Sequence, residues 1–243
     1  MKGIAIGLVV LLCGCGTGMM DVKVNSPGAS MKFVDAAISN GLPGAALTAT
    51  RGMLERDPRN VPALLRQGEA LAAMGRGDAA AESYRRALEV EPGSADALLG
   101  LGRTELAAGR AADAEAAFRR ALSAGQDSGA VRSNLGVALD LQGRHGEAQA
   151  EYQASLARSE SDATRVNLGL SLALSGKTGQ ALTTLRPIAA DPAAPPRVRH
   201  NLAVALALAG SPPEAETLLR PDMSGEQVRL AIAGIQALQA PPR

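Results

Sequence analysis

Side chains that could carry out acid–base, nucleophilic or metal chemistry are few in this chain. It contains two histidines, His145 and His200, and two cysteines, Cys13 and Cys15. The histidines are far apart and have no Cys, Asp or Glu at metal-ligand spacing beside them, which argues against a zinc site or a Ser–His–Asp triad. His145 lies in the stretch 143–146, whose Gly-Arg-His-Gly sequence is typical of a solvated turn. We therefore expect no enzyme activity, no metal and no cofactor.

The first residues are typical of a signal segment. Met1-Lys2 is a short basic start, and the following apolar run from Ile4 to Leu12 is too short to span a bilayer. Both cysteines lie at the end of this segment, so we expect no disulfide in the mature protein.

The apolar run ends in Leu12-Cys13-Gly14-Cys15, which resembles the lipobox of bacterial lipoproteins. Cys15 is the expected site of acylation, because the small Gly14 precedes it. The resemblance implies several acyl chains on Cys15, and at roughly 0.8 kcal/mol per buried CH₂ two or more chains make a stable membrane anchor. Gly16 after the cysteine implies the outer membrane. An ordinary cleaved signal peptide with incidental cysteines is the alternative.

Composition favours packed helices. Hydrophobic residues make up 46% of the 243 residues but aromatic ones only 2%, so Ala and Leu carry most of the apolar content. This bias suits helices better than strands, which prefer β-branched and aromatic side chains. The net charge of +1 gives no field that would attract nucleic acid.

The chain contains internal repeats of 33 to 34 residues. Each repeat has a glycine at the end of its first helix, at Gly75, Gly109, Gly143, Gly176 and Gly210, where a left-handed cap is expected. Small residues recur in both helices, where a larger side chain would prevent close crossing. The repeat-packing residues are Gly68, Ala80, Gly102, Ala114, Gly136, Ala148, Gly169, Ala181, Ala203 and Ala215.

This pattern resembles the tetratricopeptide repeat (TPR), which implies an all-α solenoid, a right-handed superhelix of helix–turn–helix hairpins with a C-terminal capping helix. The predicted parts are a lipoprotein signal peptide and lipobox at 1–15, a flexible tether at 16–30, repeats at 31–223 and the capping helix and tail at 224–243. The repeats comprise a partial unit at 31–58 and units that start near 61, 95, 129, 162 and 196. Ser224 is the expected N-cap of the capping helix, with Gln227 three residues later.

The resemblance also implies a concave groove, lined by the first helix of each unit, that holds a protein partner. The expected lining residues are Leu65, Glu69, Leu99, Arg103, Leu106, Val137, Asp140, Leu141, Val166, Leu170, Leu174, His200, Val204 and Leu208. Because this lining is largely aliphatic towards the C-terminal half, we expect a helical or apolar extended partner rather than a charged tail. The alternative is that the capping helix or neighbouring units cover these side chains.

Arginines recur at Arg132, Arg165 and Arg199, which should form a ladder along one edge. They could contact an acidic partner, but we favour a structural role in which their stems pack between units and their charged groups pair with Glu or water.

The lipobox, the repeated Arg-x-Asn-Leu and the stretches 201–210 and 218–224 together resemble the TadD lipoproteins of Flp (tight adherence) pilus assembly. This resemblance implies a periplasm-facing outer-membrane scaffold or adaptor that binds the secretin or other pilus components, without nucleic acid or a small-molecule substrate. One alternative is a repeat lipoprotein of another envelope machine, such as a type IV pilus, a secretion system or outer-membrane protein assembly. A second is a non-catalytic activator of a cell-wall enzyme.

Overall fold

The computed structural model describes residues 27–237, and this part of the chain folds into helices without a strand. The thirteen helices are α1 (Pro27–Ser39), α2 (Pro43–Arg56), α3 (Val61–Ala73), α4 (Gly77–Val90), α5 (Ala95–Ala107), α6 (Ala111–Ser123), α7 (Gly129–Asp140), α8 (His145–Leu156), α9 (Asp162–Leu174), α10 (Thr178–Ala189), α11 (Pro196–Leu208), α12 (Pro212–Leu219) and α13 (Gly225–Ala237). The expected all-α class is therefore confirmed, and α3, α5, α7, α9 and α11 begin at the predicted starts of the units.

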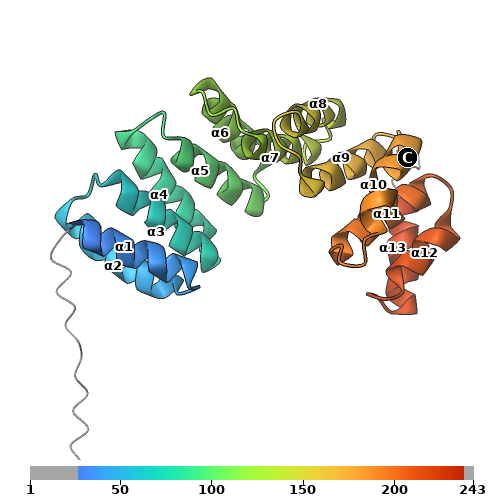
Figure 1. Cartoon of the computed structure of the whole chain (residues 1–243), viewed down its shortest axis with the longest axis horizontal. Coiled ribbons are helices and arrows are strands. Elements are labelled where there is room, and N and C mark those ends of the chain that lie inside the picture. The colour runs from blue at the N-terminus through green and yellow to red at the C-terminus, as the bar shows by residue number, and fades with distance from the viewer. Residues whose placement is uncertain (1–26, 238–243) are drawn as a thin grey trace, which may run out of the picture.

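The helices pack as consecutive hairpins that stack into an arch (Figure 1). Each helix contacts the next one along the chain, and each first helix of a pair also contacts the first helix of the following pair. The second helices α4, α6, α8, α10 and α12 make no comparable contacts with one another. The first helices are therefore closer together and form the inner, concave side of the arch.

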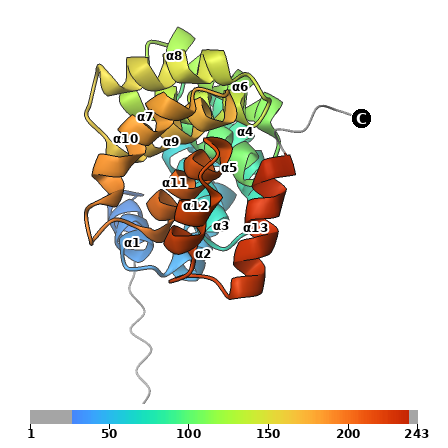
Figure 2. The same ribbon diagram turned by 90° about the vertical axis from the view of Figure 1, so that its right-hand side faces the viewer.

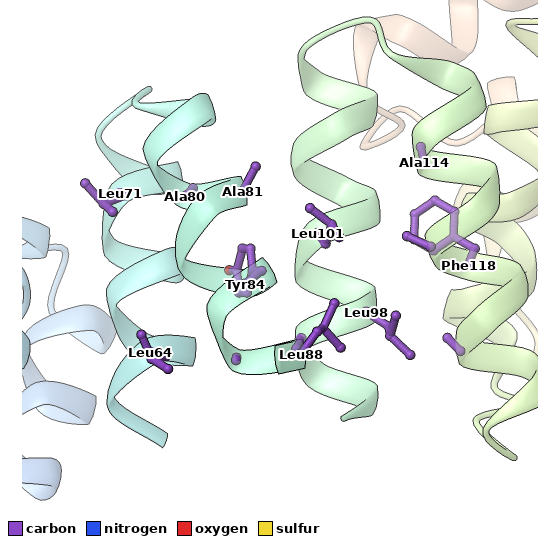
Figure 3. Close-up of a cluster of buried hydrophobic side chains, with 14 of the residues drawn as sticks. Leu64, Leu71, Ala80, Ala81, Tyr84, Leu88, Leu98, Leu101, Ala114 and Phe118 are labelled. Carbon is purple, nitrogen blue, oxygen red and sulfur yellow. The ribbon is translucent and has the colours of Figure 1, made fainter. Parts of the chain in front are cut away.

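The predicted small residues lie where helices cross closely. A Cβ placed on Gly102 would lie 2.5 Å from a ring carbon of Phe118, and one on Gly136 would lie 2.6 Å from the ring of Tyr152. A Cβ on Gly68 would likewise clash with the ring of Tyr84, and one on Gly169 would clash with the side chain of Leu185. The predicted packing alanines are fully buried. Figure 3 shows the aromatic member of two such pairs, Tyr84 and Phe118.

The turn glycines adopt the left-handed conformation that the repeat pattern predicted. Gly75, Gly109 and Gly143 have φ of 72°, 74° and 74°, a region that residues with a Cβ rarely adopt. Gly125, with φ of 85°, ends the second full unit in the same conformation and was not predicted.

The two ends of the described chain differ in how well the sequence predicted them. Helix α1 begins at Pro27, so the expected tether at 16–30 is wrong for residues 27–30, where proline at the first helical position favours helix initiation. At the other end α13 begins as predicted: the Ser224 hydroxyl accepts from the Gln227 amide at 3.3 Å, and the Gln227 side chain accepts from the Ser224 amide at 2.8 Å. Helix α13 then packs against α11 and α12 at the end of the stack (Figure 2).

The hydrophobic core consists of two clusters. One extends from Val34 to Tyr152 and the other from Val166 to Ile232, with the half-buried Leu168 in contact with both. Hydrogen bonds between polar side chains join the two at the junction of the third and fourth full units, where the pairs are Ser133–Thr164, Asp140–Ser171, Gln149–Ser175 and Gln149–Lys177. The continuous apolar packing of the first units therefore changes to polar packing at this junction.

Within residues 27–237, no helix has the length and hydrophobicity needed to cross a bilayer.

Candidate partner-binding face

The concave face, by which we mean the surface of α3, α5, α7, α9 and α11, carries most of the residues that the sequence predicted there. Three of them, Arg103, Leu141 and Leu174, are exposed. Nine are half-buried: Leu65, Glu69, Leu99, Leu106, Val137, Asp140, Leu170, His200 and Val204.

Two predicted lining residues belong to the core instead. Val166 has an exposed fraction of 1% and Leu208 of 9%, and both are members of the C-terminal hydrophobic cluster. In this half of the molecule α9 and α11 contact each other closely, so side chains between them are enclosed. The prediction that Val166 and Leu208 line an open surface is therefore wrong.

Apolar side chains do reach solvent further along the concave face. Leu141, at the C-terminal end of α7, is 61% exposed, and Leu174, the last residue of α9, is 38% exposed. The two leucines stand one repeat apart, and the half-buried Leu170 lies one turn before Leu174. Exposed leucines at equivalent positions of neighbouring units give this part of the face an apolar character.

The three recurrent arginines pair with carboxylates of the same chain. Arg132 bonds Asp127 at 2.5 Å and Glu151 at 2.8 Å. Arg165 pairs with Asp162 at 2.7 Å and with Glu160 at 3.2 Å.

Arg199 pairs with Asp222 at 3.0 Å, and His200 contacts the same carboxylate at 3.1 Å. The pKa of Asp222 is lowered. The hydrogen bond from Arg199 is the largest cause, burial acts in the opposite direction, and the hydrogen bond with His200 lowers the pKa further. The favoured structural role of the arginines agrees with these pairs, which leave little positive charge for an acidic partner.

Asp140 is the centre of a polar cluster rather than a simple lining residue. Its carboxylate contacts Nδ1 of His145 at 2.8 Å and accepts from the Tyr152 hydroxyl at 2.9 Å and the Ser171 hydroxyl at 2.7 Å. Burial raises the pKa of Tyr152, and the Asp140 charge raises it further. His145 is therefore the first residue of α8 and a half-buried partner of Asp140, not the residue of a solvated turn that the sequence suggested.

Buried carboxylates between repeats were missed by the sequence interpretation. Glu115 is buried and accepts from Arg144 at 2.7 Å and Gln142 at 2.6 Å. Burial raises the pKa of Glu115, but the hydrogen bonds from Gln142 and Arg144 and the charges of Arg119 and Arg144 outweigh it, so the pKa is lowered. The available signal was the basic residue that follows four of the five predicted turn glycines, as Arg144 follows Gly143.

A cavity of about 790 Å³ lies between α9, α10 and the loop before α11. Its lining mixes apolar residues such as Pro187 and Ile188 with Arg165, Arg197 and Asp191. Within residues 27–237 no group of three His, Cys, Asp or Glu side chains could hold a metal ion. Cys15, the predicted lipidation site, lies outside the described residues.

Comparison with known proteins agrees with this geometry. A family model described as tetratricopeptide repeat matches residues 31–95, 65–129 and 99–163, and a second model of the same description matches residues 163–187 and 196–221. No curated protein matches the chain.

Several solved structures share the fold. The chain is similar to PilW, described as a widely conserved type IV pilus biogenesis factor, with 22% identity over 84% of this chain and 97% of that one and a TM-score of 0.73. PilF of Pseudomonas aeruginosa matches with 18% identity over 86% of this chain and 96% of PilF, and with a TM-score of 0.69. YrrB, described as a TPR protein with an unusual peptide-binding site, matches with 21% identity over 77% of this chain and 98% of YrrB, and with a TM-score of 0.59.

Neither matching family model describes an enzyme, and repeats of this kind typically form non-catalytic scaffolds for protein–protein interaction. With the family model covering more than half of the sequence and the helix pairs stacked as the repeat requires, the chain belongs to the tetratricopeptide repeat family.

Proposed function

We propose that the chain is a scaffold or adaptor of the bacterial cell envelope that assists assembly of the Flp (Tad) pilus and secretion. It binds the secretin or another pilus component through its concave face. The observation that carries this proposal is the exposure of Leu141 and Leu174 beside the half-buried Leu170 and Val204 on that face. Apolar side chains that a monomer leaves exposed at equivalent places of adjacent repeats suit the apolar side of a partner segment.

The proposal includes a membrane anchor at Cys15. The lipobox resemblance supports acylation of this cysteine, and Gly16 supports the outer membrane with the repeats facing the periplasm. An anchored scaffold would hold its partner at the membrane where the secretin assembles.

A type IV pilus role is the second candidate. The likeness of the fold to PilW and PilF favours it. The Arg-x-Asn-Leu repeats and the C-terminal stretches 201–210 and 218–224, which resemble TadD lipoproteins, favour the Flp pilus. Roles in outer-membrane protein assembly or as activator of a cell-wall enzyme have no comparable support.

The test compares recovery of pilus components by the full-length wild type and by charged variants. Leu174→Glu alone, and Leu170→Glu with Val204→Glu, should reduce recovery of the secretin about tenfold, because a carboxylate would have to be buried against an apolar partner. Ala116→Glu with Ala150→Glu is the matched control, since both alanines are exposed on second helices, at the outer side of the arch. Equal recovery by all variants would rule out the concave face as the binding site.

The anchor is tested separately. Cys15→Ser should move the protein from the membrane to the soluble fraction, and a variant that still sediments with membranes would contradict anchoring through this cysteine. If the wild type recovers the secretin from the membrane fraction and Cys15→Ser does not, binding and anchoring are linked as the proposal requires.

A further inference from the structure

Two tyrosines occupy the same place in different repeats but differ at their hydroxyl groups. Tyr84 and Tyr152 both pack against the glycine of their own hairpin, Gly68 and Gly136 respectively. The Tyr152 hydroxyl donates to Asp140 at 2.9 Å. The Tyr84 hydroxyl has no hydrogen-bond partner in residues 27–237.

The difference follows from a single residue. Asp140 stands twelve positions before Tyr152, and Ala72 stands at the corresponding position before Tyr84. Ala72 lies in α3 and is exposed, so no side-chain acceptor occupies the place that Asp140 fills two repeats later. Tyr84 as a whole is only 4% exposed, but its unpartnered hydroxyl is not among the fully buried polar atoms of the described residues, so the oxygen retains a small contact with solvent. This phenol O–H is therefore a donor that no group of the described residues satisfies.

The ring that carries this hydroxyl is held from both sides. A Cβ on Gly68 would lie 2.7 Å from the ring carbon Cζ of Tyr84, and one on Gly100 would lie 2.5 Å from the same atom. Figure 3 shows the ring between α3, which carries Leu64 and Leu71, and α5, which carries Leu98 and Leu101. The ring is therefore held tightly between two helices, and the two glycines leave no side chain of their own over its hydroxyl end.

An unpaired cation lies one helical turn from the glycine that contacts the Tyr84 ring. Arg103 is exposed on α5, one turn after Gly100, and makes no hydrogen bond or ion pair within residues 27–237. Burial raises the pKa of Tyr84 and the Glu69 charge raises it further, whereas the charges of Arg103 and Arg66 lower it, which agrees with the positions of these side chains around the ring. Glu69 itself is paired with Arg66 at 3.1 Å, so its charge is partly neutralised.

We propose that the Tyr84 hydroxyl and the Arg103 guanidinium together bind the carboxylate of an aspartate or glutamate side chain in the partner segment. This inference rests on the proposed function and adds an acidic anchor to the apolar contacts. Both groups are donors without an acceptor, and a carboxylate offers an oxygen to each. Leu141 and Leu174 lie further along the same face, so an extended partner that contacts them continues past this site, and the acid is a side chain within it rather than its terminal carboxylate.

The experiment selects peptides on the full-length chain. A phage library of twelve-residue random peptides, fused through their C-termini so that no terminal carboxylate is free, is panned on the wild type. Selected peptides should share one fixed Asp or Glu with apolar residues on one side of it. Synthetic amidated copies should bind about tenfold more weakly when that acid is replaced by its amide.

Three variants locate the site. Tyr84→Phe and Arg103→Gln should each weaken binding of the selected peptides about tenfold. Ala72→Asp should do the same, because it places within the protein the acceptor that Asp140 provides for Tyr152. The matched controls are Tyr152→Phe, which removes a hydroxyl already bonded to Asp140, and Arg229→Gln, which makes the same charge change at an exposed, unpaired arginine on α13; neither should alter binding.

The outcomes separate this inference from the proposed function. Peptides that lack a fixed acid but lose binding with Leu174→Glu would overturn the carboxylate site and leave the scaffold role standing. Acidic peptides that bind Tyr84→Phe, Arg103→Gln and Ala72→Asp as well as they bind the wild type would also overturn it, as would failure to select any peptide. A preference for peptides with a free C-terminal carboxylate, measured with unamidated copies, would contradict the assignment to an internal side chain.

Discussion

At the scale of single residues, the effect of a glycine depends on what its missing side chain would meet. A Cβ on Gly102 would meet the buried ring of Phe118, whereas a Cβ on Gly52, in the interior of α2, would have no neighbouring atom within 4 Å. The first glycine is required by close helix crossing, and the second only weakens its helix.

This contrast makes a paired prediction. Gly102→Ala should lower the free energy of unfolding by about 1–2 kcal/mol, because overpacking costs more than the gain in helix propensity. Gly52→Ala should raise it by about 0.5–1 kcal/mol. Urea unfolding followed by circular dichroism measures both, and a shift of the two midpoints in the same direction would show that the Phe118 contact does not decide the outcome.

Residue partners were harder to predict than residue positions. The spacing of Arg132, Arg165 and Arg199 predicted that they recur at one place in the repeat. Their carboxylate partners could not be derived, because Asp127 and Asp222 lie in the connections after α6 and α12, whose course the repeat does not determine.

At the scale of elements, α12 and α13 both follow a serine, but only one serine caps its helix. The Ser224 hydroxyl accepts from the Gln227 amide, whereas the side chain of Ser211 makes no capping hydrogen bond to α12. The same residue type at the same place therefore contributes differently to the two helices.

We expect Ser224→Ala to destabilise α13 by about 1 kcal/mol, the usual contribution of an N-cap serine. Amide hydrogen exchange should accelerate in residues 225–237 and remain unchanged in α3–α6. Ser211→Ala is the matched control and should leave exchange in α12 unaltered. Equal acceleration in both helices would show that the capping hydrogen bond of Ser224 does not account for the effect.

Helix boundaries were predictable where a repeat defined them. The unit starts agree with the helices because glycine turns and small crossing residues recur in a fixed frame. At the N-terminal end no full repeat precedes Met31, and the sequence interpretation did not use Pro27 as a helix start, so α1 was placed four residues too late.

At the scale of the whole molecule, the polar junction between the third and fourth units divides the core into two clusters. In repeat proteins, stability is the sum of units and of the interfaces between neighbours, so a polar interface reduces the coupling between the two parts. The C-terminal part, α9–α13, should therefore unfold without unfolding α3–α6.

Core truncations test this division. Leu185→Ala removes a fully buried side chain from the C-terminal cluster and should cost about 2–5 kcal/mol, seen as faster amide exchange in α9–α12 and not in α3–α5. Leu64→Ala, an equally buried leucine of the other cluster, should give the opposite pattern. Uniform acceleration across all helices in either variant would show a single cooperative unit.

The architecture was predictable because one short pattern is repeated, so each unit supports the interpretation of the others. The candidate site was less predictable because it depends on departures from that pattern. One departure is Ala72, which stands where a later unit has the acceptor Asp140. The other is Gly100, which stands where later units have Asn134 and Asn167. Neither is informative until the packing around Tyr84 is known.

Helix α13 has a consequence for association between molecules. A solenoid with two bare ends can add copies of itself head to tail and grow into filaments, because such contacts do not close. By laying Val228 and Ile232 against the last hairpin, α13 occupies the surface on which another copy would stack. Growth in that direction is thereby terminated, and the protein can present its inner surface as a single unit of defined length.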